Sequence, residues 1–246
     1  VEAGKMGFRW IRADTDLFRV RTIAVAGTER LTGAMVIEAA GLRIGDDILD
    51  LDMTALARKV ESLPRVKSAE ARRTLKREVF LKIVERRPQA LVLLDSMHEV
   101  DDEGVVLPPD SLGGVADLTI IFGLDAVVPE YGQRIQAEGL MPALHLVQSL
   151  ARPEVGLDAA VSEIRADRPD SLVMVMIQDG VPVRVGNGDI PPRRLTAFRA
   201  VFEDLTRKKI DSEYLDLRFA GQVIVKPRPE TPEDPSGIGA AGSGKN

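Results

Sequence analysis

The sequence predicts an α+β fold in two parts: a small module of order β-α-α-β-β at 18–87, and a mixed module of strands and helices at 88–227. Three observations lead to this prediction. The first part holds five regular patterns in fixed order, separated by glycine and proline. The second part is richer in strand patterns. Of the 246 residues, 44% are hydrophobic and 29% are charged, as in folded soluble proteins.

The first module begins with a strand and ends at Pro88. The predicted elements are, in order, a strand at Val20 to Val25, a turn at Ala26-Gly27, a helix from about Thr32 to Ala40, a helix from near Asp52 to Pro64, and strands at Val66 to Arg73 and Val79 to Arg86. Gly41 suits the position that ends the first helix. Asp52 suits the N-cap of the second.

Apolar spacing places both helices on one side of a three-stranded sheet. The second helix has a stripe at helical spacing, formed by Met53, Leu56, Val60 and Leu63. Alternation gives one strand an apolar face, formed by Val79, Leu81 and Ile83. Helices covering one face of the sheet bury both sets.

The second module is a series of short strands with two helices. The predicted strands are Leu91 to Leu94, Met97 to Val100, Val105 to Leu107, Leu118 to Leu124, Val161 to Arg165, Leu172 to Ile177, Val181 to Val185, Tyr214 to Phe219 and Gln222 to Lys226. The predicted helices are Met141 to Ala151 and Pro192 to about Lys208. Pro182 lacks an N–H, which favours an edge strand. Residues 228–246 are rich in Pro, Glu, Gly and Ser and are predicted to be a disordered tail.

Composition argues against several classes of function. The net charge of −5 and the aromatic content of 4% disfavour nucleic-acid binding. The absence of cysteine excludes disulfides and thiolate metal sites. No apolar run approaches the roughly 20 residues that span a bilayer. Residues 1–17 carry Met6, Phe8, Trp10 and Ile11 among charges. We interpret them as a juxtamembrane segment that follows an upstream anchor, with a frayed terminus as the alternative.

Catalytic and ligand-binding signals are weak. His98 stands beside acidic residues, but those acids form a hairpin turn at 101–104, where Asp and Gly have backbone reasons to occur. One histidine is a poor metal site. His145 lies among apolar helix positions, which indicates a structural role. Residues 241–245 resemble the end of a phosphate loop but lack its first glycine. We therefore expect no enzyme activity, no cofactor, no metal and no small-molecule substrate.

Basic residues dominate the stretch from Arg65 to Arg87, where only Glu70, Glu78 and Glu85 are acidic. A solvated outer sheet face explains this pattern. Contact with an anionic membrane surface is the alternative.

Several stretches resemble the FtsQ/DivIB family of bacterial cell-division proteins. The first, Phe18 to Gly27, resembles the first strand of a POTRA domain. Further stretches are Ala40 to Gly45 with Leu49 to Asp52, Leu63 to Ala69, Ile83 to Pro88 with its Glu-Arg-Arg-Pro ending, Val100 to Val106, and Tyr214 to Phe219 with its Asp-Leu-Arg core. The resemblance covers roughly Phe18 to Lys226.

The resemblance implies a POTRA domain at 18–87, followed by the β domain of the family at 88–227. Such proteins are single-pass proteins of the cytoplasmic membrane with these domains on the outer side. They have no catalytic activity. They act at the division septum as scaffolds of the divisome, and they bind FtsB and FtsL partners, or DivIC in Gram-positive relatives. This chain lacks the cytoplasmic tail and the membrane helix, so we expect it to be the extracytoplasmic part.

The resemblance also places the FtsB site on the C-terminal strands and the preceding helix. In this sequence the implied contact residues are Arg193, Ala197, Arg218, Phe219, Gln222, Val223, Ile224 and Val225. Backbone pairing along 222–225 would add a partner strand. Phe219 would be an apolar anchor and Arg218 a charged donor. The alternative is that Phe219 and Val223 are core residues and that Arg218 pairs with Asp216.

Two other functions stay open at this stage. POTRA domains also occur in outer-membrane assembly and secretion proteins, which would carry further POTRA copies or a barrel. An enzyme of unknown class would need a cleft with perturbed ionisable groups.

Overall fold

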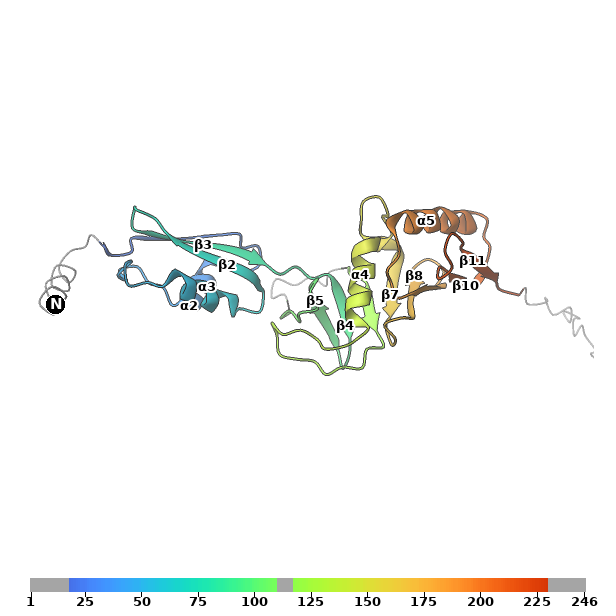
Figure 1. The fold of residues 1–246 in the computed structure, drawn as a ribbon, viewed down its shortest axis with the longest axis horizontal. Helices are drawn as coiled ribbons and strands as arrows, with labels where there is room; N and C mark the ends of the chain where they lie inside the picture. The colour runs from blue at the N-terminus through green and yellow to red at the C-terminus, as the bar shows by residue number, and fades with distance from the viewer. Residues whose placement is uncertain (1–17, 110–116, 230–246) are drawn as a thin grey trace, which may run out of the picture.

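The computed structural model describes residues 18–109 and 117–229. They form two modules that follow one another along an elongated molecule (Figure 1). The first module comprises the elements from Thr22 to Glu85, and the second those from Ala90 to Pro227. The predicted α+β class is confirmed. The predicted juxtamembrane segment 1–17, and residues 230–246 of the predicted tail, lie outside the described residues.

The first module is a three-stranded sheet with helices on one face. Its elements are β1 (Thr22–Ala26), α2 (Gly33–Ala40), α3 (Met53–Glu61), β2 (Val66–Arg73) and β3 (Glu78–Glu85). The strand order is β1-β3-β2. Strand β1 runs parallel to the central β3, and β2 runs antiparallel to it. The β-α-α-β-β order is therefore the predicted one.

Local chemistry fixes the ends of both helices. The Thr32 hydroxyl accepts a hydrogen bond from the Met35 N–H at 3.2 Å and caps α2. Gly41 ends this helix with a φ of +66°, a conformation that glycine adopts without strain. Asp52 caps α3, because its carboxylate accepts the Thr54 N–H at 2.9 Å. The predicted end at Gly41 and the predicted cap at Asp52 are confirmed, and α2 begins next to Thr32, its predicted start.

The core of the first module lies between these helices and the sheet. The buried residues of the helices and of β3 are Val36, Ala40, Leu56, Val60, Val79, Leu81 and Ile83. Met53 and Leu63, at the two ends of the predicted stripe, are partly buried against this cluster. The opposite face of the sheet is not covered by any helix of the module (Figure 1).

The second module is built on one eight-stranded mixed sheet. Its elements are β4 (Ala90–Leu93), β5 (Met97–Val100), β6 (Ile120–Phe122), α4 (Leu140–Leu150), η2 (Asp158–Ala160), β7 (Val161–Arg165), β8 (Leu172–Met176), β9 (Pro182–Gly186), α5 (Pro192–Arg207), β10 (Ser212–Asp216) and β11 (Ile224–Pro227). The strand order is β11-β10-β9-β8-β7-β6-β4-β5. The sheet therefore ends at β11 on one side and at β5 on the other.

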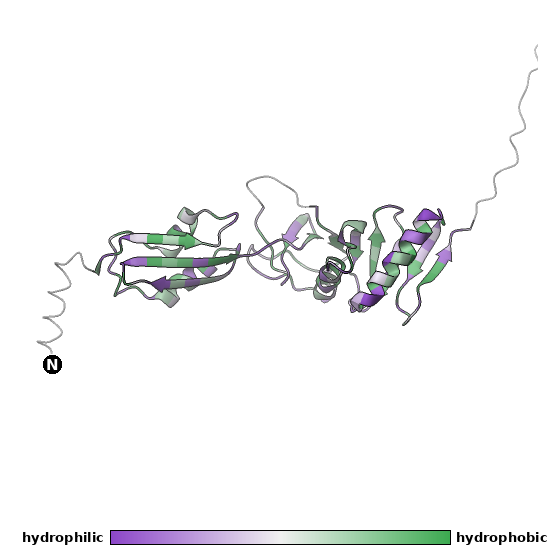
Figure 2. Ribbon diagram, turned by 90° about the horizontal axis from the view of Figure 1, so that it is seen from above, coloured by the Kyte–Doolittle hydropathy of each residue, from purple (hydrophilic) through white to green (hydrophobic). Residues whose placement is uncertain are grey.

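Alternation along the strands packs one face of this sheet against α4 and α5. In β8, Leu172, Met174 and Met176 are buried and the residues between them are only half-buried. They share one core with Leu144 of α4 and Phe198 of α5. The ribbon of α5 carries both hydrophobic and hydrophilic residues, as an amphipathic helix on a sheet requires (Figure 2).

The prediction that Pro182 marks an edge strand is wrong, because β9 lies between β8 and β10. The Met176 N–H donates to the Val181 carbonyl, so Val181 faces β8 and the Pro182 nitrogen faces the opposite side. On that side, pairing with β10 begins only at Val183. The N–H that Pro182 lacks is therefore not needed, because it lies one residue before the pairing of β9 with β10 begins.

Several predicted boundaries shift. In the strand predicted at 105–107, only Val105 and Val106 pair, each through an isolated bridge. The strand predicted at 214–219 lies at 212–216, and the one predicted at 222–226 lies at 224–227. The second helix ends at Glu61 and not at Pro64, and the helix predicted at Met141 to Ala151 spans Leu140–Leu150. Arg228, assigned to the tail, still donates its N–H to the Asp211 carbonyl at 3.0 Å.

The two modules are joined by ion pairs between four cations of the first and four acids around the β5 hairpin turn of the second. The pairs are Arg30 and Arg65 with Glu99, Lys67 with Asp102 and Glu103, and Arg86 with Asp101 and Glu103. Asp101 is fully buried and also accepts the N–H groups of Glu103 and Val105, each at 2.9 Å. The acidic turn thus binds the first module through ion pairs.

Glu85, the last residue of β3, organises the loop between β1 and α2. Its carboxylate is nearly buried and accepts three backbone N–H groups, from Glu29, Arg30 and Leu31, each at 2.9 Å. Neighbouring Arg87 is exposed and forms an ion pair with Glu29. The Glu-Arg-Arg sequence therefore has three different structural roles at this junction.

Candidate functional site

The candidate site is the edge of the second sheet at β11. This strand pairs with β10 on one side, and no described strand pairs with its other side. It lies at the end of the molecule farthest from the first module (Figure 1). An unpaired strand edge exposes N–H and C=O groups that a partner strand can bind.

Hydrogen bonds to β10 determine which groups of β11 point outward. The Arg228 N–H donates to Asp211, so Arg228 faces β10. Because direction alternates along a strand, Lys226 and Ile224 also face β10, and Val225 and Pro227 face away. Val225 therefore offers both its N–H and its C=O to a partner. Pro227 offers only a carbonyl, which limits how far a partner strand could pair.

The predicted apolar residues of this edge divide into two groups. Phe219 is 51% exposed and Ile224 is 39% exposed. Val223 and Val225 pack, partly buried, against the core of the second module. The alternative that Phe219 is a core residue is thus wrong, whereas it holds in part for Val223.

A groove of about 340 Å³ lies between the first turns of α5 and the loop before β11. It brings together four of the predicted residues, Arg193 and Ala197 from α5 and Gln222 and Val223 from the loop. The other lining residues are Pro191, Arg194, Ala220 and Gly221. The groove is continuous with the edge, because Val223 directly precedes β11.

Arg194 holds the loop against α5, a role that sequence reasoning missed. Its guanidinium donates to the backbone carbonyls of Leu217 and Phe219. These bonds position Phe219 next to the groove. Apolar periodicity identifies the buried stripe of α5, but nothing in the sequence distinguishes Arg194 from the exposed Arg193. Only the tertiary packing of the loop reveals the difference.

Arg218 is bound to Asp216 by a two-pronged ion pair, as one of the alternatives predicted. Its Nε lies 3.0 Å from Oδ1 and its Nη2 lies 2.7 Å from Oδ2 of Asp216. The Asp216 carboxylate is buried, and the hydrogen bonds from Arg218 lower its pKa. The same contact raises the pKa of Arg218. The Nε and Nη2 atoms of Arg218 are therefore occupied by Asp216, while the rest of its side chain stays accessible to a partner.

This ion pair predicts a pH-dependent contribution to stability. A carboxylate with a depressed folded pKa stabilises above its unfolded pKa of about 3.9, and the contribution is lost as the pH falls through the folded pKa. We expect Asp216→Asn to lower the free energy of unfolding by about 1–2 kcal/mol at neutral pH, and the gap to wild type to close below about pH 4. Urea unfolding at both pH values measures this.

Glu213→Gln is the matched control for that experiment. Glu213 pairs with Lys226 at 2.9 Å, but both side chains are half-exposed, so the expected loss is under about 0.5 kcal/mol. A gap for Asp216→Asn that is equally large at low pH would contradict the assigned role of the carboxylate.

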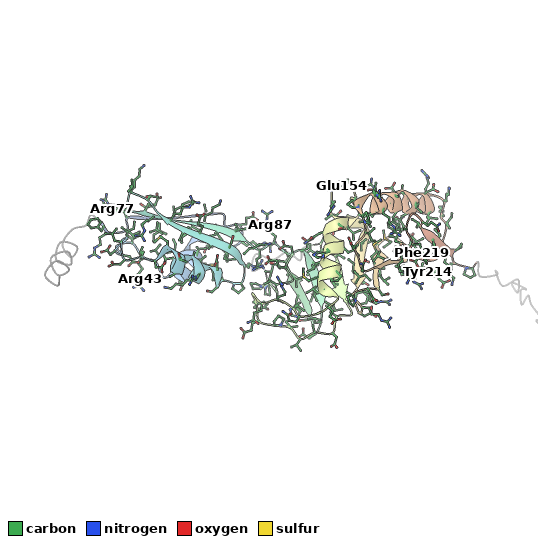
Figure 3. All side chains as sticks on the ribbon, in the orientation of Figure 1. Arg43, Arg77, Arg87, Glu154, Tyr214 and Phe219 are labelled. Carbon is green, nitrogen blue, oxygen red and sulfur yellow. The ribbon has the colours of Figure 1, made fainter. Side chains whose placement is uncertain are left out.

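Tyr214 connects the last three strands on the face opposite the helices. The Arg184 guanidinium lies 4.0 Å from the centre of its ring, and the Lys226 ammonium lies 5.5 Å from it. Figure 3 shows Tyr214 and Phe219 at the same end of the molecule. Arg193 is exposed nearby, whereas Lys226 and Arg218 are paired with Glu213 and Asp216.

The two histidines lie away from this edge. His98 pairs with the Asp95 carboxylate at 2.8 Å, and His145 is exposed on α4. Across 18–109 and 117–229, no group of three or more His, Cys, Asp or Glu side chains could hold a metal ion. Among the same residues, none of the helices has the length and hydrophobicity required to cross a membrane.

Comparison with known proteins gives two family matches along the chain. Residues 18–86 match the POTRA domain of FtsQ type, and residues 90–218 match the C-terminal domain of cell division protein FtsQ/DivIB. The chain is 31% identical to cell division protein FtsQ of Anaeromyxobacter sp. (strain K), over 87% of this chain and 72% of the relative. It is 36% identical to that of Streptomyces coelicolor, over 87% and 80%. It is 27% identical to that of Geobacter sp. (strain M21), over 86% and 77%.

Proposed function

The chain belongs to the FtsQ/DivIB family of cell-division proteins, and we propose that it is a non-enzymatic scaffold of the divisome that binds FtsB- and FtsL-type partners at the β11 edge. The observation that carries the proposal is a strand edge without a described partner strand, beside a groove and an exposed aromatic residue, Phe219. Such a surface can bind an extended segment of another protein.

Each part of the edge has a proposed role in this contact. The N–H and C=O of Val225 pair with the backbone of the added strand. Phe219 is an apolar anchor for a partner side chain, and the groove formed by α5 receives a second one. Arg193 and Arg218 attract an acidic flank of the partner, which raises the association rate more than the affinity.

We propose that the molecule acts outside the cytoplasmic membrane at the division septum, where it links early and late steps of septal assembly. The matched relatives are cell-division proteins, which supports division over the outer-membrane assembly alternative. Partner contact at the far end of an elongated molecule suits a scaffold, because the first module remains available for other division proteins.

Replacing Val225 by proline tests the backbone contact. Proline removes only the outward N–H, so pairing with β10 is retained. We expect the affinity for the FtsB-type protein of the same genome to fall about 30-fold, because one backbone bond is lost and a partner carbonyl is left unpaired at a cost of about 2 kcal/mol. Titration calorimetry with the purified chain measures this.

Phe219→Glu tests the anchor, with an expected loss of tenfold or more. Met97→Glu is its control, since Met97 is similarly exposed but lies on β5, the opposite edge of the sheet. Unchanged affinity for the Val225 and Phe219 variants, with far-UV circular dichroism showing them folded, would refute the site. Absence of binding by the wild-type chain would refute the proposed function itself.

A further inference from the structure

A second surface lies at the opposite end of the molecule and has no role in partner binding at β11. It combines exposed cations with two exposed aliphatic side chains at the outer end of the first module. We call it the tip patch and define it as Arg19, Arg21, Arg43, Ile44, Leu75 and Lys76. We propose that the tip patch binds the surface of an anionic lipid bilayer and inserts Leu75 and Ile44 among the lipid headgroups.

Backbone hydrogen bonds bring the three segments of the patch together. The Arg21 N–H donates to the Arg77 carbonyl in the β2–β3 turn at 2.9 Å. The Gly45 N–H donates to the Val20 carbonyl at 2.9 Å, which places the 43–46 loop on the other side of the same segment. Figure 3 shows Arg43 and Arg77 at one end of the first module and Arg87 at the other.

The two aliphatic side chains of the tip patch, Leu75 and Ile44, are too exposed to belong to the hydrophobic core. Leu75 is fully exposed at the tip of the turn, and Ile44 is 72% exposed. The turn that presents Leu75 is held by hydrogen bonds between Thr74 and Glu78 at 2.8 Å and between Arg77 and Thr74 at 3.3 Å. Apolar side chains held at a protruding end, close to cations, are typical of surfaces that dip into a lipid interface.

The charge around these residues favours an anionic surface. The Arg19, Arg21, Arg43 and Lys76 side chains are exposed. Asp46 and Asp47, next to the patch in the chain, accept the backbone N–H groups of Arg43 and Leu49, at 2.7 and 3.0 Å. Both acids are half-buried, as is Glu78 two residues after Lys76. Each Lys or Arg close to an anionic leaflet strengthens binding several-fold. An acidic protein would satisfy the cations but not the aliphatic pair, so a bilayer is the occupant that fits both.

This proposal goes beyond partner binding and does not depend on it. The tip patch and β11 lie at opposite ends of the long axis (Figure 1). A bilayer at one end therefore leaves the partner edge accessible at the other.

Co-sedimentation of the full chain with vesicles tests the proposal. One set contains phosphatidylcholine alone and the other phosphatidylcholine mixed with phosphatidylglycerol. We expect binding only to the mixed vesicles. We expect Arg43→Glu/Lys76→Glu to weaken it about tenfold or more, and Leu75→Ser/Ile44→Ser to weaken it about tenfold. Residues 1–17 are identical in every variant, so the differences report on the tip patch.

Matched controls lie elsewhere on the surface. Val127→Ser removes an aliphatic side chain that is also highly exposed, and Arg152→Glu/Lys208→Glu reverses two exposed cations of the second module. Both should bind as wild type does. Unchanged vesicle binding by the two tip variants would overturn the proposal. A second outcome would also overturn the proposal. In it, Arg43→Glu/Lys76→Glu loses vesicle binding, Leu75→Ser/Ile44→Ser keeps it, and the wild-type chain binds a soluble polyglutamate peptide as tightly as it binds the mixed vesicles. The tip patch would then be assigned to an acidic protein.

Discussion

Glu85→Ala is expected to lower the free energy of unfolding of the first module by about 3 kcal/mol or more. The Glu85 carboxylate accepts the N–H groups of three consecutive residues at the start of the loop that leads to α2. Each buried donor left without an acceptor costs about 1–3 kcal/mol, and bonds to a charged acceptor are the stronger ones. Water can reach this part-buried loop and bind some of the freed N–H groups, so the expected loss is smaller than three times the full cost of an unpaired donor.

Glu61→Ala is the control for this prediction. Glu61 also accepts one backbone N–H, from Ala69 at 3.0 Å, but at an exposed site, so we expect a loss under about 1 kcal/mol. Urea unfolding followed by circular dichroism gives the free energies, and hydrogen exchange at 29–31 shows whether the loop opens. Equal effects of the two substitutions would contradict the role assigned to Glu85.

The position of Glu85 could be predicted from the sequence, but its role could not. The Glu-Arg-Arg-Pro ending was recognisable as the end of the module. The donors to Glu85 lie 54 to 56 residues earlier in the chain, in a loop whose path depends on how β1 pairs with β3. Sequence patterns carry little information on such long-range contacts, because local spacing does not encode them.

Features governed by local chemistry were predicted best. The sequence predicts the start of α2 at Thr32, its end at Gly41 and the N-cap of α3 at Asp52, and the structure confirms all three. Each depends on interactions within a few residues. The error at Pro182 has the opposite origin, because whether a strand is an edge depends on where β10 pairs, about 30 residues later in the chain.

In the candidate site, too, local features can be predicted and long-range contacts cannot. The resemblance implies contact roles for Phe219 and Ile224, and both side chains are exposed. Arg194 was missed, because its acceptors are backbone carbonyls of a loop in a different element. The ion pair between Arg218 and Asp216 joins residues only two positions apart, so the sequence alone predicts it as one of two alternatives.

The ion pair between Arg86 and the buried Asp101 stabilises the junction between the modules. Arg86→Met is expected to destabilise the protein by about 3 kcal/mol, because the Oδ2 atom of Asp101 stays buried without its cation. The other oxygen, Oδ1, still accepts the N–H groups of Glu103 and Val105. Urea unfolding measures the loss, and small-angle X-ray scattering shows whether the two modules change their relative orientation.

Two further variants separate a buried unpaired charge from a general weakening of the junction. Asp101→Asn keeps an oxygen acceptor for both N–H groups but removes the charge, so Arg86→Met/Asp101→Asn should recover at least half of the loss. Lys67→Met breaks only the part-exposed pairs with Asp102 and Glu103 and should cost under about 1 kcal/mol. If the double variant were as unstable as Arg86→Met, the loss would come from missing packing of the arginine stem and not from the charge. The stability of the junction would then depend on side-chain packing rather than on electrostatics.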